Sequence, residues 1–193
     1  MRIALSGSHS TGKSTLIAAF VDLRRQYLYE PEAYEAFADD VALTSSEGPS
    51  PDGLQSLLDY TIAAVRRQGP DACVIFERSP VDYLAYAAAS RDAWSAPFTR
   101  EFLAAAVPAV RSSLRHLDLI ALLPVSDAGP IRPRRDEDER FRKRVDDKLR
   151  RALIDDDYDL LDDRDLPRVV ELSPLPARQI TELMRLTEPD QSR

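Results

Sequence analysis

Short apolar segments alternate along this chain with longer stretches in which apolar residues recur at the spacing of a helix. Each short segment predicts a buried strand, and the predicted strands cover residues 3–5, 27–30, 72–76, 117–123 and 169–172. The longer stretches predict helices over residues 13–25, 54–65, 80–89, 97–115 and 176–186, and one that ends near residue 152. This alternation is typical of the α/β class, in which a parallel sheet carries helices on both faces.

Local signals mark where several elements begin or end. Ser79 precedes Pro80, and Asp82 stands three residues after the serine. This order predicts a helix whose first turn is capped by the serine. Within helix 97–115, we expect a break or kink near Pro108.

The length of the chain, 193 residues, suits one domain of ordinary size. We expect that domain to span residues 1–187 and to be followed by a flexible tail over 188–193. Residues 44–53 are rich in Ser, Pro and Gly and predict a loop.

The most specific motif follows the first predicted strand directly. The pattern G-x-x-x-x-G-K-[ST] is matched at Gly7, Gly12, Lys13 and Ser14. The glycines let backbone N–H groups point inward at phosphate oxygens, and the following helix adds the positive end of its dipole. We expect Lys13 to reach the β- and γ-phosphates and the Ser14 hydroxyl to bind Mg²⁺. The predicted phosphate-binding residues are Gly7, Ser8, His9, Ser10, Thr11, Gly12, Lys13, Ser14 and Thr15.

The use of lysine in this chain supports the same interpretation. The chain has three lysines against 23 arginines, and Lys13 is the only lysine among the first 142 residues. A compact ammonium group fits between phosphates where a planar guanidinium does not. The loop therefore predicts a nucleoside triphosphate site, with ATP and Mg²⁺ as its occupants.

Composition excludes several other classes of protein. No apolar run approaches the roughly 18 residues that a membrane-spanning helix needs, so no membrane partner is expected. The net charge is −7, and only residues 131–151 are locally basic, with ten Arg or Lys against six Asp or Glu. This balance argues against nucleic acid as a partner. The single cysteine, Cys73, predicts a cytoplasmic location.

Charged residues follow two further predicted strands, at the edge where ligands of such sheets bind. Glu77 and Arg78 follow strand 72–76. With Ser14, Glu77 is predicted to hold Mg²⁺, and Arg78 to contact a phosphate; an ordinary ion pair is the alternative. Glu30 ends the second predicted strand. Its carboxylate is either the base that takes the proton of an acceptor hydroxyl or a surface glutamate.

An arginine-rich segment over about residues 126–145 is predicted to be a lid. Its Arg132, Arg134 and Arg140 are predicted catalytic residues that neutralise charge as the γ-phosphoryl group moves. The acidic residues 136–139 lie among these arginines, so a solvated helix face is the alternative.

Together these residues resemble the P-loop nucleoside and nucleotide kinases, and more narrowly small bacterial AAA-type ATP-binding domains similar to nicotinamide riboside kinases and deoxynucleoside kinases. The resemblance rests on GSHSTGKST at 7–15, YEPEAYEAF at 29–37, IFERSPVDYLAYA at 75–87 and the arginine-rich segment from residue 131. It implies a three-layer P-loop NTPase fold, a five-stranded parallel sheet of order 2-3-1-4-5, an ATP donor and an arginine-rich lid.

The resemblance to deoxynucleoside kinases also implies roles for individual positions. Their E-P pair carries the general base, which falls here on Glu30. A glutamine that reads the base of the acceptor would fall near Gln55, and the loop that holds the base of the nucleotide would fall around residues 173–175.

The sequence thus predicts a Mg-ATP-dependent kinase that phosphorylates a hydroxyl of a small, nucleoside-like acceptor. The alternative is a non-kinase ATP-binding or ATPase switch that reports its nucleotide state to a partner protein. ATP and a small-molecule acceptor are the predicted partners, and the sequence leaves a homodimer open.

Overall fold

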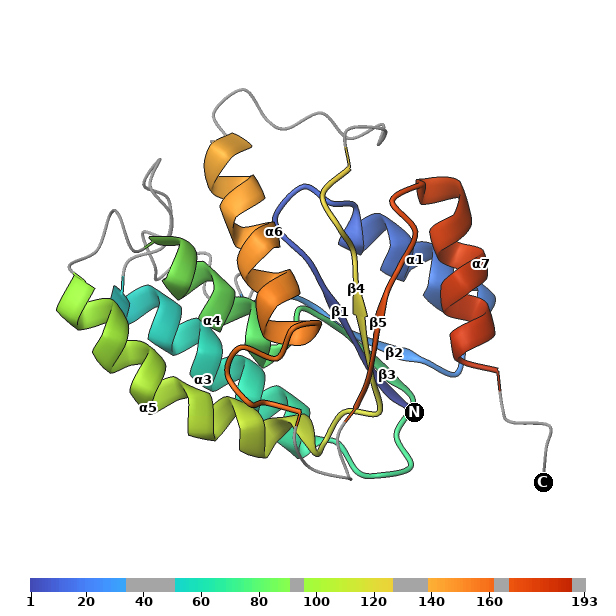
Figure 1. Ribbon diagram of the computed structural model, residues 1–193. Helices are drawn as coiled ribbons and strands as arrows, with labels where there is room; N and C mark the ends of the chain where they lie inside the picture. Colours follow the sequence, from blue (N-terminus) through green and yellow to red (C-terminus); the bar gives the residue numbers. More distant parts are fainter. Residues whose placement is uncertain (34–50, 91–95, 127–138, 162–166, 189–193) are drawn as a thin grey trace.

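The computed structural model describes residues 1–33, 51–90, 96–126, 139–161 and 167–188 (Figure 1). Strands and helices alternate through these residues as the sequence predicts. The elements are β1 (Arg2–Ser6), α1 (Lys13–Leu23), β2 (Leu28–Glu30), α3 (Pro51–Arg67), β3 (Val74–Glu77), α4 (Pro80–Ala89), α5 (Ala96–Leu114), β4 (Leu119–Leu122), α6 (Glu139–Leu153), β5 (Arg168–Glu171) and α7 (Pro176–Leu186).

The five strands form one parallel sheet in the order β2-β3-β1-β4-β5, which confirms the predicted fold class and strand order. In register, Leu5 of β1 lies opposite Glu77 of β3, and Ser6 lies opposite Leu122 of β4. Because all strands run the same way, their carboxyl ends share one edge of the sheet. The residues that follow β1, β2 and β3 therefore meet at that edge.

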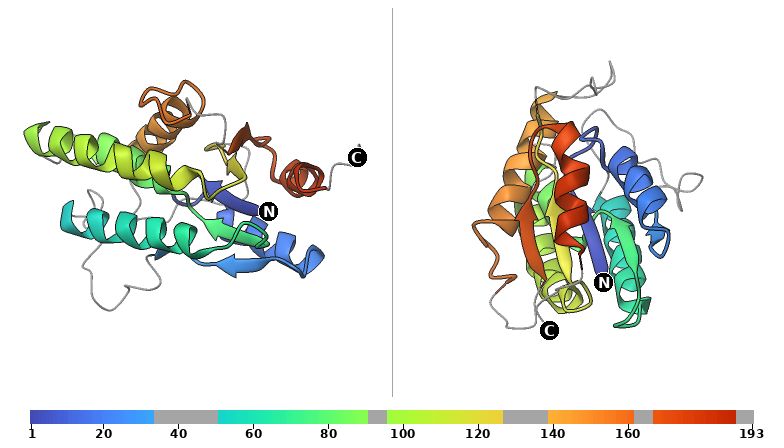
Figure 2. Two further views of the ribbon diagram at one scale, coloured as in Figure 1. Left: turned by 90° about the horizontal axis from the view of Figure 1, so that it is seen from below. Right: turned by 90° about the vertical axis from the view of Figure 1, so that its right-hand side faces the viewer.

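Helices cover both faces of the sheet (Figures 1 and 2). α1 and α7 pack on one face, and α3, α4, α5 and α6 pack on the other. Successive strand residues belong to opposite faces: Ile3 and Leu5 lie in the core beneath α1, whereas Ala4 lies in the core beneath α4. Both faces are buried at the central strands β1, β3 and β4, which explains their apolar runs, whereas the edge strands β2 and β5 are partly exposed.

Two local predictions need correction. α5 continues through Pro108 as one helix, so a break is absent there and only the kink stays a prediction. Its buried face includes Ala106 and Val110, on either side of the proline, and this packing outweighs the missing hydrogen bond. α3 begins at Pro51, so residues 51–53 are helical rather than part of a loop. Proline suits this first position because no intrahelical partner is needed there.

The capped start of α4 is confirmed. The Ser79 hydroxyl accepts a hydrogen bond from the N–H of Val81 at 3.2 Å, and Asp82 accepts one from the N–H of Ser79 at 2.9 Å. This reciprocal pair fixes the turn from β3 into α4. Within the described ranges, no helix is both long and apolar enough to cross a membrane. Residues 44–50 of the predicted loop and 189–193 of the predicted tail lie outside those ranges.

Candidate functional site

The glycine loop between β1 and α1 needs glycine at both motif positions. Gly7 has a φ of 155° and Gly12 a φ of 95°, in the region that favours glycine. A Cβ atom on Gly7 would also lie 2.8 Å from the backbone oxygen of Leu123. Gly12 stands directly before α1, whose first turn begins at Lys13. The N–H groups of that turn, which have no partner within the helix, therefore border the loop, an arrangement typical of phosphate sites.

Lys13 is buried, with 4% of its surface exposed, and its ammonium group donates to the backbone oxygen of Ser8 at 2.8 Å. The hydroxyl of Thr11 donates to the same oxygen at 3.0 Å. Burial and the neighbouring guanidinium of Arg78 lower the pKa of Lys13 to about 8, although nearby carboxylates oppose the shift. A buried cation held mainly by a neutral carbonyl is well suited to an anionic ligand.

Ser14 and Glu77 lie together, as predicted for a magnesium site. The Ser14 hydroxyl donates to Glu77 Oε1 at 2.8 Å, and the hydroxyl of Tyr29 donates to Glu77 Oε2 at 2.5 Å. A hydroxyl and a carboxylate are hard oxygen ligands of the type that Mg²⁺ prefers. Among the described residues there is no group of three or more His, Cys, Asp or Glu that could hold a metal ion. A pair of protein ligands is nevertheless sufficient when phosphates and waters complete the shell.

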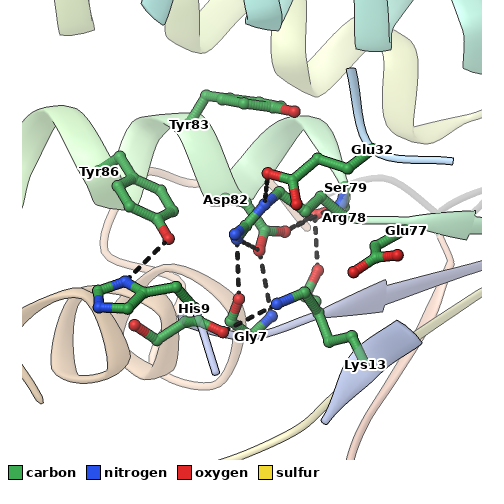
Figure 3. A network of polar contacts seen from close by, with 12 residues as sticks. Gly7, His9, Lys13, Glu32, Glu77, Arg78, Ser79, Asp82, Tyr83 and Tyr86 are labelled. Carbon is green, nitrogen blue, oxygen red and sulfur yellow. Dashed lines mark hydrogen bonds and ion pairs between the residues drawn. The ribbon is translucent and has the colours of Figure 1, made fainter. Parts of the chain in front are cut away.

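Arg78 occupies the turn between β3 and α4 and has a φ of 77°, unusual for a residue with a side chain. It is buried, and its guanidinium pairs with Glu32 and donates to the backbone oxygen of Gly7 at 2.9 Å and to Asp82 at 3.3 Å (Figure 3). The same group lies 5.0 Å from the ring centre of Tyr86. Burial alone would lower the pKa of Arg78, but Glu32 and the other neighbours raise it. Strain and burial coincide at this residue, as they do at many functional sites.

Glu32, and not Glu30, joins this cluster. Burial raises the pKa of Glu32, but Arg78 and Lys13 outweigh it and lower the pKa overall, so the carboxylate is charged at neutral pH. Glu30 instead accepts from Arg67 of α3 at 2.9 Å. The prediction of Glu30 as a residue of the site is therefore not supported by its contacts. The sequence did carry a signal, since acids stand on both sides of Pro31, but their spacing does not show which one turns toward Arg78.

The loop also contacts α6, the helix that follows the predicted lid. The Ser8 hydroxyl donates to the backbone oxygen of Arg142 at 3.0 Å. The ring of His9 lies 6.3 Å from that of Phe141, and its Nδ1 is 3.4 Å from the hydroxyl of Tyr86. Sequence reasoning did not anticipate these contacts, because residues 8 and 9 vary freely in the motif.

The predicted lid falls largely outside the described residues. Arg132 and Arg134 belong to residues 127–138, of which nothing is described, and Arg140 is exposed in the first turn of α6. Arg142 of the same segment is not among the predicted catalytic residues, yet it is buried, with 5% of its surface exposed. Its Nε has no hydrogen-bond partner within the described part of the chain. Among the described residues, it is thus the buried arginine nearest in sequence to the predicted ones.

Two other predicted sites, the base-reading Gln55 and the nucleotide-base loop at 173–175, lie away from this cluster. Gln55, the predicted base-reading residue, is exposed and donates to Asp59 at 2.9 Å. The predicted nucleotide-base loop at 173–175 is ordered by α7, since the N–H of Ser173 donates to Glu182 at 2.7 Å. It borders an open cavity of about 560 Å³ between β5 and α7 that contains no residue of the glycine loop.

The sheet order and the glycine loop define the class: this is a P-loop NTPase with the fold of the nucleoside kinases. A family model described as an AAA domain matches residues 2–166, and the chain belongs to that family. No curated protein sequence matches the chain significantly.

Solved structures share the fold at low sequence identity. Deoxyadenosine kinase from M. mycoides with bound dATP superposes with a TM-score of 0.61 and 16% identity, over 96% of this chain and 98% of the kinase. The same enzyme with the products dCMP and dCDP gives the same TM-score and identity, over 96% and 97%. NadR in complex with NR gives a TM-score of 0.58 and 21% identity, over 89% of this chain but only 43% of NadR. This chain therefore spans less than half of NadR.

Proposed function

We propose that this protein is a kinase that transfers the γ-phosphoryl group of Mg-ATP to a hydroxyl of a small, nucleoside-like acceptor. The observation that carries the proposal is the Glu32–Arg78 ion pair beside Lys13. Glu77 already serves the Ser14 hydroxyl, so Glu32 is a second carboxylate at the same site. A charged carboxylate beside the donor phosphates supports a group that takes a proton during phosphoryl transfer.

The contacts support a division of roles. Lys13 and the later N–H groups of the loop hold the donor phosphates, and Glu32 replaces Glu30 as the candidate base. In the transfer, the acceptor oxygen forms a bond to the γ-phosphorus and the bond from that phosphorus to the β,γ-bridging oxygen breaks. Glu32 takes the proton of the acceptor hydroxyl, and ADP leaves. Arg78 holds the Glu32 carboxylate charged and oriented.

The residues present fit a magnesium ion. The Ser14 hydroxyl and the Glu77 carboxylate, which lie 2.8 Å apart, would hold it beside the phosphates. When bound, the ion would neutralise charge on the donor phosphates. Tyr29 orients the second oxygen of Glu77. Negative charge on the transferring phosphoryl group would be neutralised by Arg142 and by Arg132, Arg134 and Arg140 of the proposed lid. The buried Nε of Arg142 lacks a partner among the described groups.

The choice of acceptor draws on the structural neighbours. One is a deoxyadenosine kinase and another, NadR, was solved with NR. Both names suggest that the acceptor is a base linked to a sugar, or a related riboside. At 16% and 21% identity these likenesses establish the fold alone, so the acceptor is a proposal for this chain.

An ATP-dependent switch is the second candidate, and one observation favours it. Ser8 and His9 connect the glycine loop directly to Arg142 and Phe141 of α6. A change in the loop on hydrolysis would therefore reach α6, which could report the bound nucleotide to a partner protein.

The test measures ADP release from ATP with a panel of nucleosides, nucleotides and vitamin ribosides. We expect release that depends on one class of acceptor. Glu32→Gln should lower kcat about 10²- to 10⁴-fold, because the amide cannot accept the proton. Glu30→Gln is the matched control and should stay within about threefold of wild type.

Two outcomes contradict parts of the proposal. ADP release that no acceptor changes would favour the switch. An acceptor-dependent enzyme in which Glu30→Gln, rather than Glu32→Gln, abolishes turnover would return the base to Glu30.

A further inference from the structure

Asp82, in the first turn of α4, carries a carboxylate with no exposed surface. Its Oδ1 accepts from the N–H of Gly7 at 3.1 Å and from the guanidinium of Arg78 at 3.3 Å. Its Oδ2 accepts from the N–H of Ser79 at 2.9 Å and from the Ser79 hydroxyl at 3.0 Å. One side chain thus joins the glycine loop, the strained arginine and the start of α4 (Figure 3).

Gly7 is held from both sides by the β3–α4 turn. Its N–H donates to Asp82, and its carbonyl accepts from Arg78 at 2.9 Å. The close approach of Gly7 to Leu123 leaves this peptide little room to move. The N–H of Gly7 is therefore committed to Asp82, and donor phosphates are left to the later N–H groups of the loop.

We propose that Asp82 is a positioning residue that fixes the glycine loop and Arg78 relative to each other. Through them it aligns the donor phosphates with Glu32, a consequence that rests on the proposed kinase function. Capping α4 requires only Oδ2, whereas the hydrogen bonds that Oδ1 accepts within the described part of the chain come from Gly7 and Arg78. Oδ2 thus caps α4, whereas Oδ1 aligns the glycine loop with Arg78.

Truncation of each capping partner separates these tasks experimentally. Asp82→Ala removes the contacts of both oxygens. Ser79→Ala removes the acceptor of the Val81 N–H and of the Ser6 hydroxyl, and one of the donors to Asp82 Oδ2. It leaves Asp82 bonded to Gly7, Arg78 and the Ser79 N–H. Urea unfolding of both variants measures the loss of stability that each truncation causes, so that activities are compared at known stability.

We expect Asp82→Ala to lower kcat on the order of 10²-fold and to weaken binding of a non-hydrolysable ATP analogue about tenfold. The KM for the acceptor should stay within about threefold, because Asp82 does not touch it. Ser79→Ala should keep kcat and analogue affinity within about threefold of wild type. Equal losses of kcat and of analogue affinity in the two variants would reduce Asp82 to a helix cap and overturn the proposal.

The experiment also distinguishes this proposal from the proposed function. If no acceptor is phosphorylated by wild type, the analogue affinities still decide: a tenfold weakening in Asp82→Ala but not in Ser79→Ala supports the alignment of the loop without a kinase. If Asp82→Ala does not fold, hydrogen exchange of the Gly7 amide in the wild-type protein decides. That amide should exchange as slowly as the centre of β1, with and without the analogue, and fast exchange would overturn the proposal.

Discussion

Two arginine–carboxylate clusters lie at opposite ends of β1 and are built differently. At the amino end, the Arg2 guanidinium pairs with Asp118 at 2.7 Å. The N–H of Arg2 donates to Asp118 Oδ2 at 2.6 Å, and the N–H of Asp118 donates to the Arg2 carbonyl at 2.8 Å. At the carboxyl end, Arg78 pairs with Glu32 and Asp82 next to a buried lysine. The Asp118 side chain is 33% exposed, whereas Asp82 has no exposed surface.

The clusters differ in backbone strain and in the pKa shift of a neighbouring group. Arg2 sits in regular strand backbone and pairs with Asp118, whose pKa is lowered further by the N-terminal ammonium. Arg78 has a left-handed φ of 77°, and its charge helps to lower the pKa of Lys13 to about 8. Strain and a shifted pKa that local folding does not require are characteristic of ligand sites. The amino-end cluster is thus expected to serve stability, and the carboxyl-end cluster to serve function.

The largest expected effect comes from Lys13→Ala. Loss of the ammonium should lower kcat/KM about 10³-fold, roughly 4 kcal/mol of transition-state stabilisation, and should also weaken ATP binding. Arg2→Ala is the control at the other end of the strand and should leave kcat/KM within a few fold. Steady-state kinetics with ATP and titration with an ATP analogue measure both. Unchanged affinity and turnover in Lys13→Ala would end the assignment of the loop as a phosphate site.

Replacement of Arg78 and of Arg2 by lysine tests whether the two clusters differ in function. Arg78→Lys keeps the charge but cannot serve Glu32, Asp82 and the Gly7 carbonyl together, so kcat should fall about 10²-fold. Arg2→Lys keeps one contact to Asp118 and should cost at most about 0.5 kcal/mol of stability with little change in kcat. Similar kcat values for the two variants would show that the clusters do not differ in function.

The sequence could predict much of this contrast but not all of it. The strand order was available from the resemblance, and the positions of Gly7, Lys13, Ser14 and Glu77 followed from motif spacing, because short turns after parallel strands leave little freedom. Glu32 could not be separated from Glu30, because its place depends on how the chain leaves the sheet after β2.

The sequence also could not predict which distant residues a buried side chain contacts. Asp82 was predicted only as a capping residue, since local spacing reveals the bond to Ser79 and conceals the one to Gly7, which lies 75 positions away. The lid arginines stay a prediction, because Arg132 and Arg134 lie outside the described residues.

Lys13→Met should stabilise the protein without ligand. A lysine pKa that falls from 10.5 to about 8 means that the folded state disfavours the charged form. This shift corresponds to at most about 3 kcal/mol at neutral pH, and the lost bond to Ser8 reduces the expected gain to about 1–2 kcal/mol. The gain should shrink as pH rises from about 8 toward 10.5, because the folded wild type then loses the proton that destabilises it. Urea unfolding at pH 7 and pH 9.5 measures this, and a variant less stable than wild type at pH 7 would contradict it.

The smallest expected effect belongs to Asp118, at the amino end. Burial raises its pKa, but the contacts from Arg2 outweigh burial and lower it below the ordinary 3.8. A lowered carboxyl pKa contributes stability that is present above pH 3.8 and is lost as pH falls through the folded value. Because the side chain is 33% exposed, solvent reduces this contribution to about 0.5 kcal/mol. Asp118→Asn should therefore change stability little at pH 7 and flatten its decline as pH falls below about 4, measured by urea unfolding. A loss of ATP affinity in this variant would instead couple the two ends of β1 and break the contrast between them.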